Sequence, residues 1–171
     1  PDSGQVWFDG QQTDGWQPHQ VVAAGMARTF QHIRLFPKMS AWENIAVGRH
    51  VHSRAGFLAS MLSLPWTRRE QRDVREKALD IMCFLGMEDR ADVEATSLAY
   101  GQQRIIELGR ALACEPRLLL LDEPAAGLNM RETSEMAKLI ARIRDTGVTV
   151  LLVEHDMTLV MNISDEVLVL S

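Results

Sequence analysis

The sequence predicts an α/β fold in which a parallel sheet forms the core and a helical region is inserted into it. Two apolar runs, RLLLL at 117–121 and VTVLLV at 148–153, have the continuous hydrophobicity of strands covered on both faces. A helical pattern at 131–145 lies between them, and strands that alternate with helices pair in parallel through right-handed crossovers. The third observation is the stretch 40–86, which is mostly helical in pattern.

The N-terminal part predicts a hairpin, a helix, a strand and a loop in that order. Apolar and polar residues alternate before a turn at Asp9 and Gly10, as in a strand that enters a β-hairpin. The segment PHQVVAAGMART at 18–29 predicts a short helix that leads into a strand. The run 30–39 has no clear period and contains Pro37, so we expect a loop there.

Helix signals then dominate up to the first apolar strand. Ser40 and Glu43 form the pattern of a capping box and predict a helix start. Gly86 is a candidate C-cap at the end of this helical stretch, and residues 101–114 predict a second helix. After the second apolar strand, a short helix and the apolar segment DEVLVL at 165–170 predict one more strand.

Composition limits the classes of protein that fit. The net charge of −5 argues against a surface devoted to nucleic acid. The longest apolar patch, 55–66, is too short to span a bilayer and is broken by serines and a proline. Cys83 and Cys114 lack partners at metal-ligand spacing, which favours buried, reduced thiols, with a lone disulfide as the alternative. Because the chain starts at Pro1 inside the predicted hairpin and stops at Ser171 just after a predicted strand, we expect an internal fragment of a longer protein.

Chemistry-bearing residues follow both apolar runs. Asp122 and Glu123 come directly after the first run, at the strand end where open parallel sheets bind their ligands. Such a pair is often only a solvated acidic turn, but it also suits a site in which one carboxylate positions Mg²⁺ and the other activates water. His155 follows the second run; a single histidine often serves as a cap, yet its place at the same edge favours one shared site.

Two loops are ambiguous when taken alone. Residues 97–104 read SLAYGQQR, a glycine-containing loop that enters a helix, and the free N–H groups and helix dipole there suit phosphate. A plain helix start, capped at Ser97 or at Tyr100 and Gly101, has the same geometry. Gln31, in the segment RTFQH, follows a strand-like stretch, and a loop glutamine without function is the simpler reading of that residue alone.

Taken together, these motifs resemble an ATP-binding cassette ATPase, the nucleotide-binding subunit of ABC transporters. In chain order they match a glutamine loop at Gln31, a signature loop at 98–103, a Walker B motif at 118–123, a D-loop at 126–129 and a switch histidine at His155. Each motif is weak or moderate alone, but five in this order over essentially the whole chain are highly specific. The segments TFQHIRLFPKMSAWENI, DEPAAGLN and EHDMTLVMNISD, with the insertion GFLASMLSLPW, are most similar to the ATPases of branched-chain amino acid importers.

The resemblance implies a P-loop NTPase-like parallel sheet core, incomplete at its N-terminus, with an inserted α-helical subdomain. Residues 1–39 would form a partial N-terminal part of the core that ends in the glutamine loop, 40–114 the helical subdomain with the signature loop, and 115–171 the C-terminal part of the core. The implied function is ATP hydrolysis that drives an importer for branched-chain or other amino acids, peripheral on the cytoplasmic face of the inner membrane. The alternative is an ABC-type ATPase of DNA repair or translation. Repair proteins carry a long coiled coil or zinc insertion before the signature loop, which this chain lacks.

The resemblance also implies a role for each site residue. Asp122 would hold Mg²⁺ through water, and Glu123 would be the general base for the hydrolytic water. Gln31 would contact the metal or that water, and His155 would hold the γ-phosphate. The ATP of a second subunit, identical or different, would be contacted across a dimer by Leu98, Ala99, Tyr100, Gly101, Gln102 and Asn129. A transmembrane permease, served by a substrate-binding protein, would contact Ile33, Arg34, Leu35, Phe36 and Pro37, and no nucleic-acid partner is expected.

Three departures from the family pattern qualify these roles. The phosphate loop G-x-x-x-x-G-K-[ST] is absent, so we expect it, and the aromatic residue that stacks on adenine, upstream of Pro1. The signature reads L-A-Y-G-Q rather than L-S-G-G-Q; Ala99 therefore lacks a hydroxyl, and backbone N–H groups with Gly101 would carry the phosphate contact. Asn129 stands where an aspartate is usual, and it is uncharged. We expect little or no ATP hydrolysis by these 171 residues alone.

Overall fold

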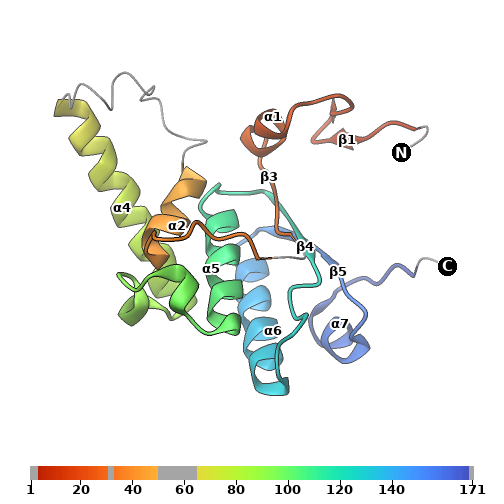
Figure 1. Cartoon of the computed structure of the whole chain (residues 1–171). Helices are drawn as coiled ribbons and strands as arrows, with labels where there is room; N and C mark the ends of the chain where they lie inside the picture. The colour runs from red at the N-terminus through yellow and green to blue at the C-terminus, as the bar shows by residue number, and fades with distance from the viewer. Residues whose placement is uncertain (1–3, 31–32, 50–64, 170–171) are drawn as a thin grey trace.

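A parallel sheet lies at the centre of the molecule, as the sequence predicts. The computed structural model describes residues 4–30, 33–49 and 65–169. Within them the main sheet contains β3 (Met26–Arg28), β4 (Leu118–Asp122) and β5 (Thr149–Val153), parallel and in the spatial order β3–β4–β5 (Figure 1). β4 pairs with β5 along its whole length, from Leu118 opposite Thr149 to Asp122 opposite Val153. The carboxyl ends of β4 and β5 therefore meet at one edge of the sheet.

Helices connect and flank these strands. α6 (Met130–Asp145) is the crossover between β4 and β5, and α7 (Met157–Ile163) follows β5 and packs against α6. In the part of the chain predicted to be a helical insertion, the described residues form α2 (Ala41–Val47), α4 (Pro65–Leu85) and α5 (Tyr100–Leu112). Short 3₁₀ turns at Glu88–Arg90 and Ala95–Ser97 join α4 to α5. The positions of α5, α6 and their flanking strands agree with the predicted elements to within one or two residues.

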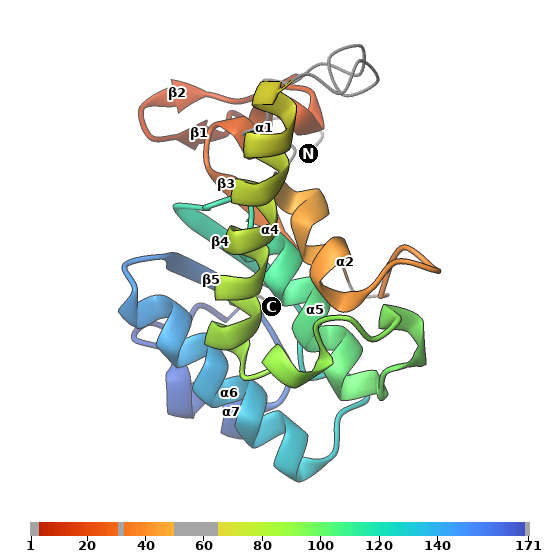
Figure 2. The same cartoon turned by 90° about the vertical axis from the view of Figure 1, so that its left-hand side faces the viewer.

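The inserted helices share one tightly packed core. α2 packs against both α4 and α5, and Figure 2 shows the three helices side by side. Ile45 of α2, Met82 of α4 and Ile106 of α5 are each 0% exposed. The predicted capping box is present: Ser40 N–H donates to Glu43 Oε2 at 2.8 Å, and Glu43 N–H donates to Ser40 Oγ at 3.3 Å. Local sequence signals and tertiary burial thus agree in this part of the chain.

Gly48 marks a close crossing between α2 and α5. A Cβ atom at this position would lie 2.2 Å from the carbonyl oxygen of Arg110 and 2.9 Å from Cβ of Ala113. Real Cβ atoms do not approach backbone oxygens so closely, so only glycine fits without a backbone shift. The end of α2 is therefore held directly against the last turn of α5.

The N-terminal segment forms the predicted hairpin and helix. β1 (Trp7–Phe8) and β2 (Gln11–Gln12) pair antiparallel around Asp9 and Gly10, whose φ angles of 51° and 74° are those of a two-residue hairpin turn. α1 (Pro18–Ala23) then leads into β3. An ion pair between Arg117 Nη1 and Asp9 Oδ2, at 2.5 Å, links the hairpin turn to the start of β4.

Three expectations about burial and strands are wrong. In the described part of the DEVLVL segment, residues 165–169 form no strand, and Leu168 and Val169 are 86% and 79% exposed. An apolar run becomes a strand only when another strand offers it hydrogen bonds, and none of the described strands does so. β5 is exposed at alternate residues, with Leu151 and Val153 about half exposed, so it is not covered on both faces. Its only partner among the described strands is β4, which leaves it at the sheet edge.

The third correction concerns a cysteine. Cys83 and Cys114 are both free, as expected, but Cys83 is exposed rather than buried. Its side chain points about 100° around the helix from that of the buried Met82, which brings it to the surface. The apolar patch at 55–66 lies mostly outside the described residues. None of the helices in the described ranges has the length and apolar character needed to cross a bilayer.

Candidate functional site

Asp122 lies at the end of β4 and faces a cation from the neighbouring strand. Arg28, the last residue of β3, donates from Nη2 to Asp122 Oδ2 at 2.9 Å. The two strands are parallel, so their carboxyl ends lie at the same edge and the arginine reaches the carboxylate. The Asp122 side chain is 31% exposed. Its negative charge is thus accessible from solvent and compensated within the chain.

Glu123 and His155 come together at the same edge, as predicted from the order of the strands. His155 Nδ1 lies 3.7 Å from Glu123 Oε1. Glu123 has a left-handed backbone with φ of 47°, and its N–H donates to the Val153 carbonyl at 2.9 Å. A left-handed conformation costs a non-glycine residue roughly 1–2 kcal/mol. The turn that follows β4 is therefore strained at the residue predicted to act as the base.

Sequence reasoning missed Glu154, the residue that links this edge to the D-loop. Its side chain is only 2% exposed. Glu154 Oε1 accepts a hydrogen bond from Ala125 N–H at 3.0 Å, and Oε2 accepts one from His155 N–H at 3.2 Å. One buried carboxylate thus fixes the end of β5 against the chain that leaves β4. No local pattern in the sequence indicates this contact, because 29 residues separate Glu154 from Ala125.

The signature loop is a short, internally bonded entry into α5. Leu98 is buried, with 7% exposure. Ala99 N–H donates to Gln102 Oε1 at 3.2 Å, and Gln103 Nε2 donates to the Leu98 carbonyl at 2.8 Å. The predicted contact residue Gln102 therefore already uses its side-chain oxygen to satisfy a backbone N–H at the helix start. Tyr100 is about half exposed, whereas Gly101 is buried.

Asn129, the last residue of the D-loop, is the N-cap of α6. Its Oδ1 accepts hydrogen bonds from the N–H groups of Arg131 and Glu132, both at 3.0 Å. Glu132 Oε2 accepts in return from Asn129 N–H at 3.0 Å, which completes a capping box. Glu132 is a further residue of the site that sequence reasoning missed, although the spacing Asn129-x-x-Glu132 is itself a local signal for this cap.

Gln31 lies outside the described residues, whereas 33–37 are described. Asn44, which is 0% exposed, holds this loop through its side-chain amide. Its Oδ1 accepts from Phe36 N–H at 2.8 Å, and its Nδ2 donates to the Phe36 carbonyl at 3.2 Å and to the Ser40 carbonyl at 3.1 Å. The side chain of Phe36 remains 46% exposed. The loop therefore has a fixed main chain and an exposed aromatic side chain.

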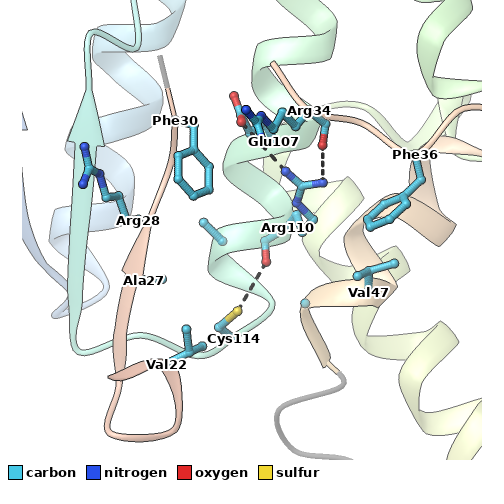
Figure 3. Close-up of a pocket in the computed structure, with 12 residues that line it drawn as sticks. Val22, Ala27, Arg28, Phe30, Arg34, Phe36, Val47, Glu107, Arg110 and Cys114 are labelled. Atoms are coloured by element: carbon cyan, nitrogen blue, oxygen red, sulfur yellow. Dashed lines mark hydrogen bonds and ion pairs between the residues drawn. The ribbon is translucent and has the colours of Figure 1, made fainter. Parts of the chain in front are cut away.

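A cavity of about 410 Å³ lies between this loop, β3 and α5. Figure 3 shows Phe30 and Phe36 on opposite sides of it, with Glu107 and Arg110 of α5 between them. Arg110 Nη1 donates to the Arg34 carbonyl at 2.6 Å, so α5 supports the loop directly. The walls combine aromatic and aliphatic surface with a few charged groups, which is the usual make-up of a binding pocket.

Glu107 is a buried carboxylate beside this cavity. It is 3% exposed, and its Oε1 has no hydrogen-bond partner among the described residues. Arg104 Nη1 lies 3.7 Å from Oε2, and Arg110 Nη2 lies 3.8 Å from Oε1. Burial raises the pKa of Glu107, and the charges of Arg110 and Arg104, with backbone hydrogen bonds at Phe30 and Arg34, only partly oppose that rise.

The residues at the sheet edge fit a magnesium site that is completed by phosphate. Within the described ranges, no three His, Cys, Asp or Glu side chains form a group that could hold a metal by themselves. Protein Mg²⁺ sites commonly use one or two carboxylates and take their other ligands from water and nucleotide phosphates. Asp122 offers one such carboxylate: its side chain is 31% exposed, and Arg28 pairs with its Oδ2.

The parallel sheet, with an aspartate, a glutamate and a histidine at its carboxyl edge, defines a P-loop NTPase-like α/β protein. The chain belongs to the ABC transporter family, whose model, described as "ABC transporter", matches residues 1–126.

Curated relatives and solved structures agree with this assignment. The chain is 44% identical to the high-affinity branched-chain amino acid transport ATP-binding protein BraF of Pseudomonas aeruginosa and 40% identical to LivG of Escherichia coli K12. Each alignment covers 100% of this chain and 68% of the relative. The ATP-binding cassette MJ1267 in its ADP conformation superimposes with a TM-score of 0.77 at 30% identity, over 96% of this chain and 64% of that one. A nucleotide-free ABC cassette gives a TM-score of 0.78 at 29% identity, with the same coverage of 96% and 64%.

Proposed function

We propose that the chain is the ATP-hydrolysing part of an ABC importer cassette for branched-chain or other amino acids. The observation that carries the proposal is the meeting of Asp122, Glu123 and His155 at one sheet edge, with His155 Nδ1 3.7 Å from Glu123 Oε1. The relatives BraF and LivG are both named as branched-chain amino acid transport ATP-binding proteins. Their names favour transport over the DNA-repair and translation alternatives.

Each residue at the edge has a defined task in this proposal. Glu123 takes the proton of the attacking water, and its carboxylate lies 3.7 Å from His155 Nδ1. His155 donates a hydrogen bond to the γ-phosphate, which fixes the phosphate beside the base. A magnesium ion bound with the nucleotide would screen the phosphate charge, with Asp122 as its protein carboxylate. Gln31, by the family resemblance, orients the water or the metal.

The activity belongs to an intact cassette, by which we mean these residues together with a phosphate loop. The 171 residues contain no G-x-x-x-x-G-K-[ST] sequence, and they span about two thirds of the relatives that they match. We therefore propose negligible hydrolysis by the 171 residues alone. ATP is then held between two subunits, identical or different, and the signature loop and Asn129 of one face the nucleotide of the other.

A permease is the proposed partner on the side of the 33–37 loop. Residues Ile33, Arg34, Leu35, Phe36 and Pro37 are the contacts that the family resemblance implies. The exposed Phe36 side chain and the cavity beside it support this surface, because a fixed loop with an aromatic anchor next to a hollow suits a docking segment. The cassette would accordingly sit at the cytoplasmic face of the plasma membrane, and the permease would work with a substrate-binding protein.

The base assignment is tested by Glu123→Gln in the intact cassette. Loss of a general base reduces turnover by about 10²- to 10⁴-fold, while ATP binding persists because the amide occupies the same space. Glu135→Gln is the matched control, since Glu135 lies exposed on α6 and pairs with Arg131 across one helical turn. Steady-state phosphate release and a nucleotide-binding titration give both quantities. Unchanged turnover in the Glu123 variant would rule out the assignment.

The substrate is tested by reconstitution with the permease in liposomes. We expect ATP-dependent uptake of leucine, isoleucine and valine that is lost with the Glu123→Gln cassette. Uptake of other amino acids under the same conditions defines the breadth of the site. ATP hydrolysis without uptake of any amino acid would contradict the transport proposal and leave the ATPase proposal standing.

A further inference from the structure

The signature loop (98–103) and the D-loop (126–129) pack against each other within one chain. A Cβ atom at Gly127 would lie 3.0 Å from Cε1 and 3.5 Å from the hydroxyl oxygen of Tyr100. Gly127 also has φ of 79°, a conformation that favours glycine. The tyrosine ring thus lies directly on the D-loop backbone. The common family signature has a glycine at the position of Tyr100, and a glycine has no ring to make this contact.

In a second contact, the side chain comes from the D-loop side and the glycine from the signature loop. A Cβ atom at Gly101 would lie 2.8 Å from Glu132 Oε1 and 3.1 Å from Glu132 Cδ. The backbone of Gly101 is helical, so its lack of a side chain is not required by its own φ. Glu132 is also the residue that accepts the Asn129 N–H at 3.0 Å and completes the cap at the end of the D-loop. A side chain at 101 would push Glu132 out of that cap.

Arg104 fixes the tyrosine from the other side. Its Nη2 donates to the Tyr100 hydroxyl at 3.1 Å, and its guanidinium carbon lies 5.5 Å from the centre of the ring. The same side chain donates from Nη1 to the Phe30 carbonyl at 3.2 Å, next to the glutamine loop. Arg104 is 4% exposed, so its side chain is held inside the fold while it makes these contacts. Tyr100 is therefore held between the D-loop and a buried arginine.

We propose that Tyr100 and Glu132 are positioning residues that lock the signature loop to the D-loop. The Tyr100 ring of the signature loop packs against Gly127 of the D-loop. The Glu132 side chain, which caps the end of the D-loop, packs against Gly101 of the signature loop. The two loops then move as one unit, and a displacement of the signature loop by nucleotide also displaces Asn129. The lock itself does not rest on the proposed function. Its consequence does: the signature loop and Asn129 of one subunit would make their contacts with the second subunit together.

Hydrogen exchange in the intact, nucleotide-free cassette tests the lock from the signature side. Ala126 N–H and Leu128 N–H are protected by hydrogen bonds of 3.1 Å to the carbonyls of Glu123 and Ala125. Tyr100→Ala removes the ring that lies against Gly127, the residue between them, and we expect their exchange to accelerate by at least about fivefold. Tyr100→Phe keeps the ring and is the control, with exchange within about twofold of the wild type. Equal D-loop exchange in Tyr100→Ala and the wild type would overturn the proposal.

The same measurement tests the lock from the D-loop side. Gln103 N–H, bonded to the Ala99 carbonyl at 3.0 Å, reports on the signature loop. Glu132→Ala empties the space beside Gly101, and we expect exchange at Gln103 to rise by at least about threefold, whereas Glu132→Gln retains an acceptor oxygen and stays near wild type. Because Glu132 is only partly buried and lies at a helix start, this variant also serves if Tyr100→Ala does not fold. Unchanged exchange at Gln103 in Glu132→Ala would contradict the lock.

ATP-driven dimerisation tests the consequence at the interface. In a Glu123→Gln background, we expect Tyr100→Ala and Glu132→Ala each to raise the ATP concentration for half-dimerisation by about fivefold, and the double variant to raise it by no more. Two independent contacts would instead multiply to about 25-fold and would overturn the proposal. Failure of the wild type to hydrolyse ATP would reject the proposed function, whereas the exchange results would still decide the lock.

Discussion

The helical side of the molecule and the β5 edge of its sheet differ in how completely they are packed. Ile45, Met82 and Ile106 are 0% exposed where α2, α4 and α5 meet. At the β5 edge, Leu151 is 50% exposed and the His155 side chain is 78% exposed. The signature loop thus leads into a helix of a completed core, whereas His155 follows a strand that is at the sheet edge within the described ranges. The difference indicates that the chain itself fixes the signature loop more firmly than His155.

Truncation of one residue from each region would measure this difference directly. Ile45→Ala removes a fully buried side chain and should lower the free energy of unfolding by about 2–5 kcal/mol. Leu151→Ala removes a side chain that is half exposed and should cost less than about 1 kcal/mol. Urea unfolding of the intact cassette gives both values. Equal losses would show that β5 is buried in the intact protein and would remove the contrast.

A polar substitution would sharpen the same comparison. Asn44→Ala removes the fully buried amide that holds Phe36 and Ser40, and we expect a loss of about 1–3 kcal/mol because backbone groups are left unpaired. Asn162→Ala, on the exposed side of α7, is the matched control and should stay within about 0.5 kcal/mol. The midpoint and slope of denaturant unfolding report the difference. Similar losses at the two positions would mean that the α2 network contributes no special stability.

The smallest expected effect is a dependence on pH at Glu107. Burial raises the pKa of this carboxyl in the folded state above its ordinary value of 4.5. The folded protein therefore holds a proton that the unfolded chain has released, and stability falls as pH rises from about 4.5 through the raised pKa. Glu107→Gln cannot titrate, so the wild type should lose stability relative to it over that window. A difference that grows in favour of the wild type as pH rises would contradict this prediction.

Features that the sequence predicted well are local ones. The capping box at Ser40 and Glu43 and the hairpin turn at Asp9 and Gly10 depend on residues within one turn of each other. The two strand ends that carry Asp122 and His155 were also predictable, because continuous apolar runs and an intervening helix define a parallel pair. These elements alone are enough to place Glu123 and His155 at the same edge of the sheet.

Contacts between distant segments could not be read from the sequence. Arg28 meets Asp122 across 94 residues, and no period or motif connects them. The DEVLVL segment shows the reverse failure, because its apolar residues have strand propensity but no described strand to pair with. Tyr100 looked like a departure from a phosphate-binding signature, and only the fold shows that its ring rests on Gly127.

Gly48 has a consequence for how this protein can change over evolutionary time. A Cβ at this position would lie 2.2 Å from the Arg110 carbonyl oxygen, so the end of α2 packs against α5 with no room for a side chain. The same Arg110 supports the Arg34 carbonyl in the loop that we propose docks a permease. Substitution at 48 would therefore shift the helix that begins with the signature loop and, through Arg110, the proposed docking loop. A change at Gly48 would therefore affect the signature loop, which we propose faces a second subunit, and the 33–37 loop, which we propose faces a permease, at the same time.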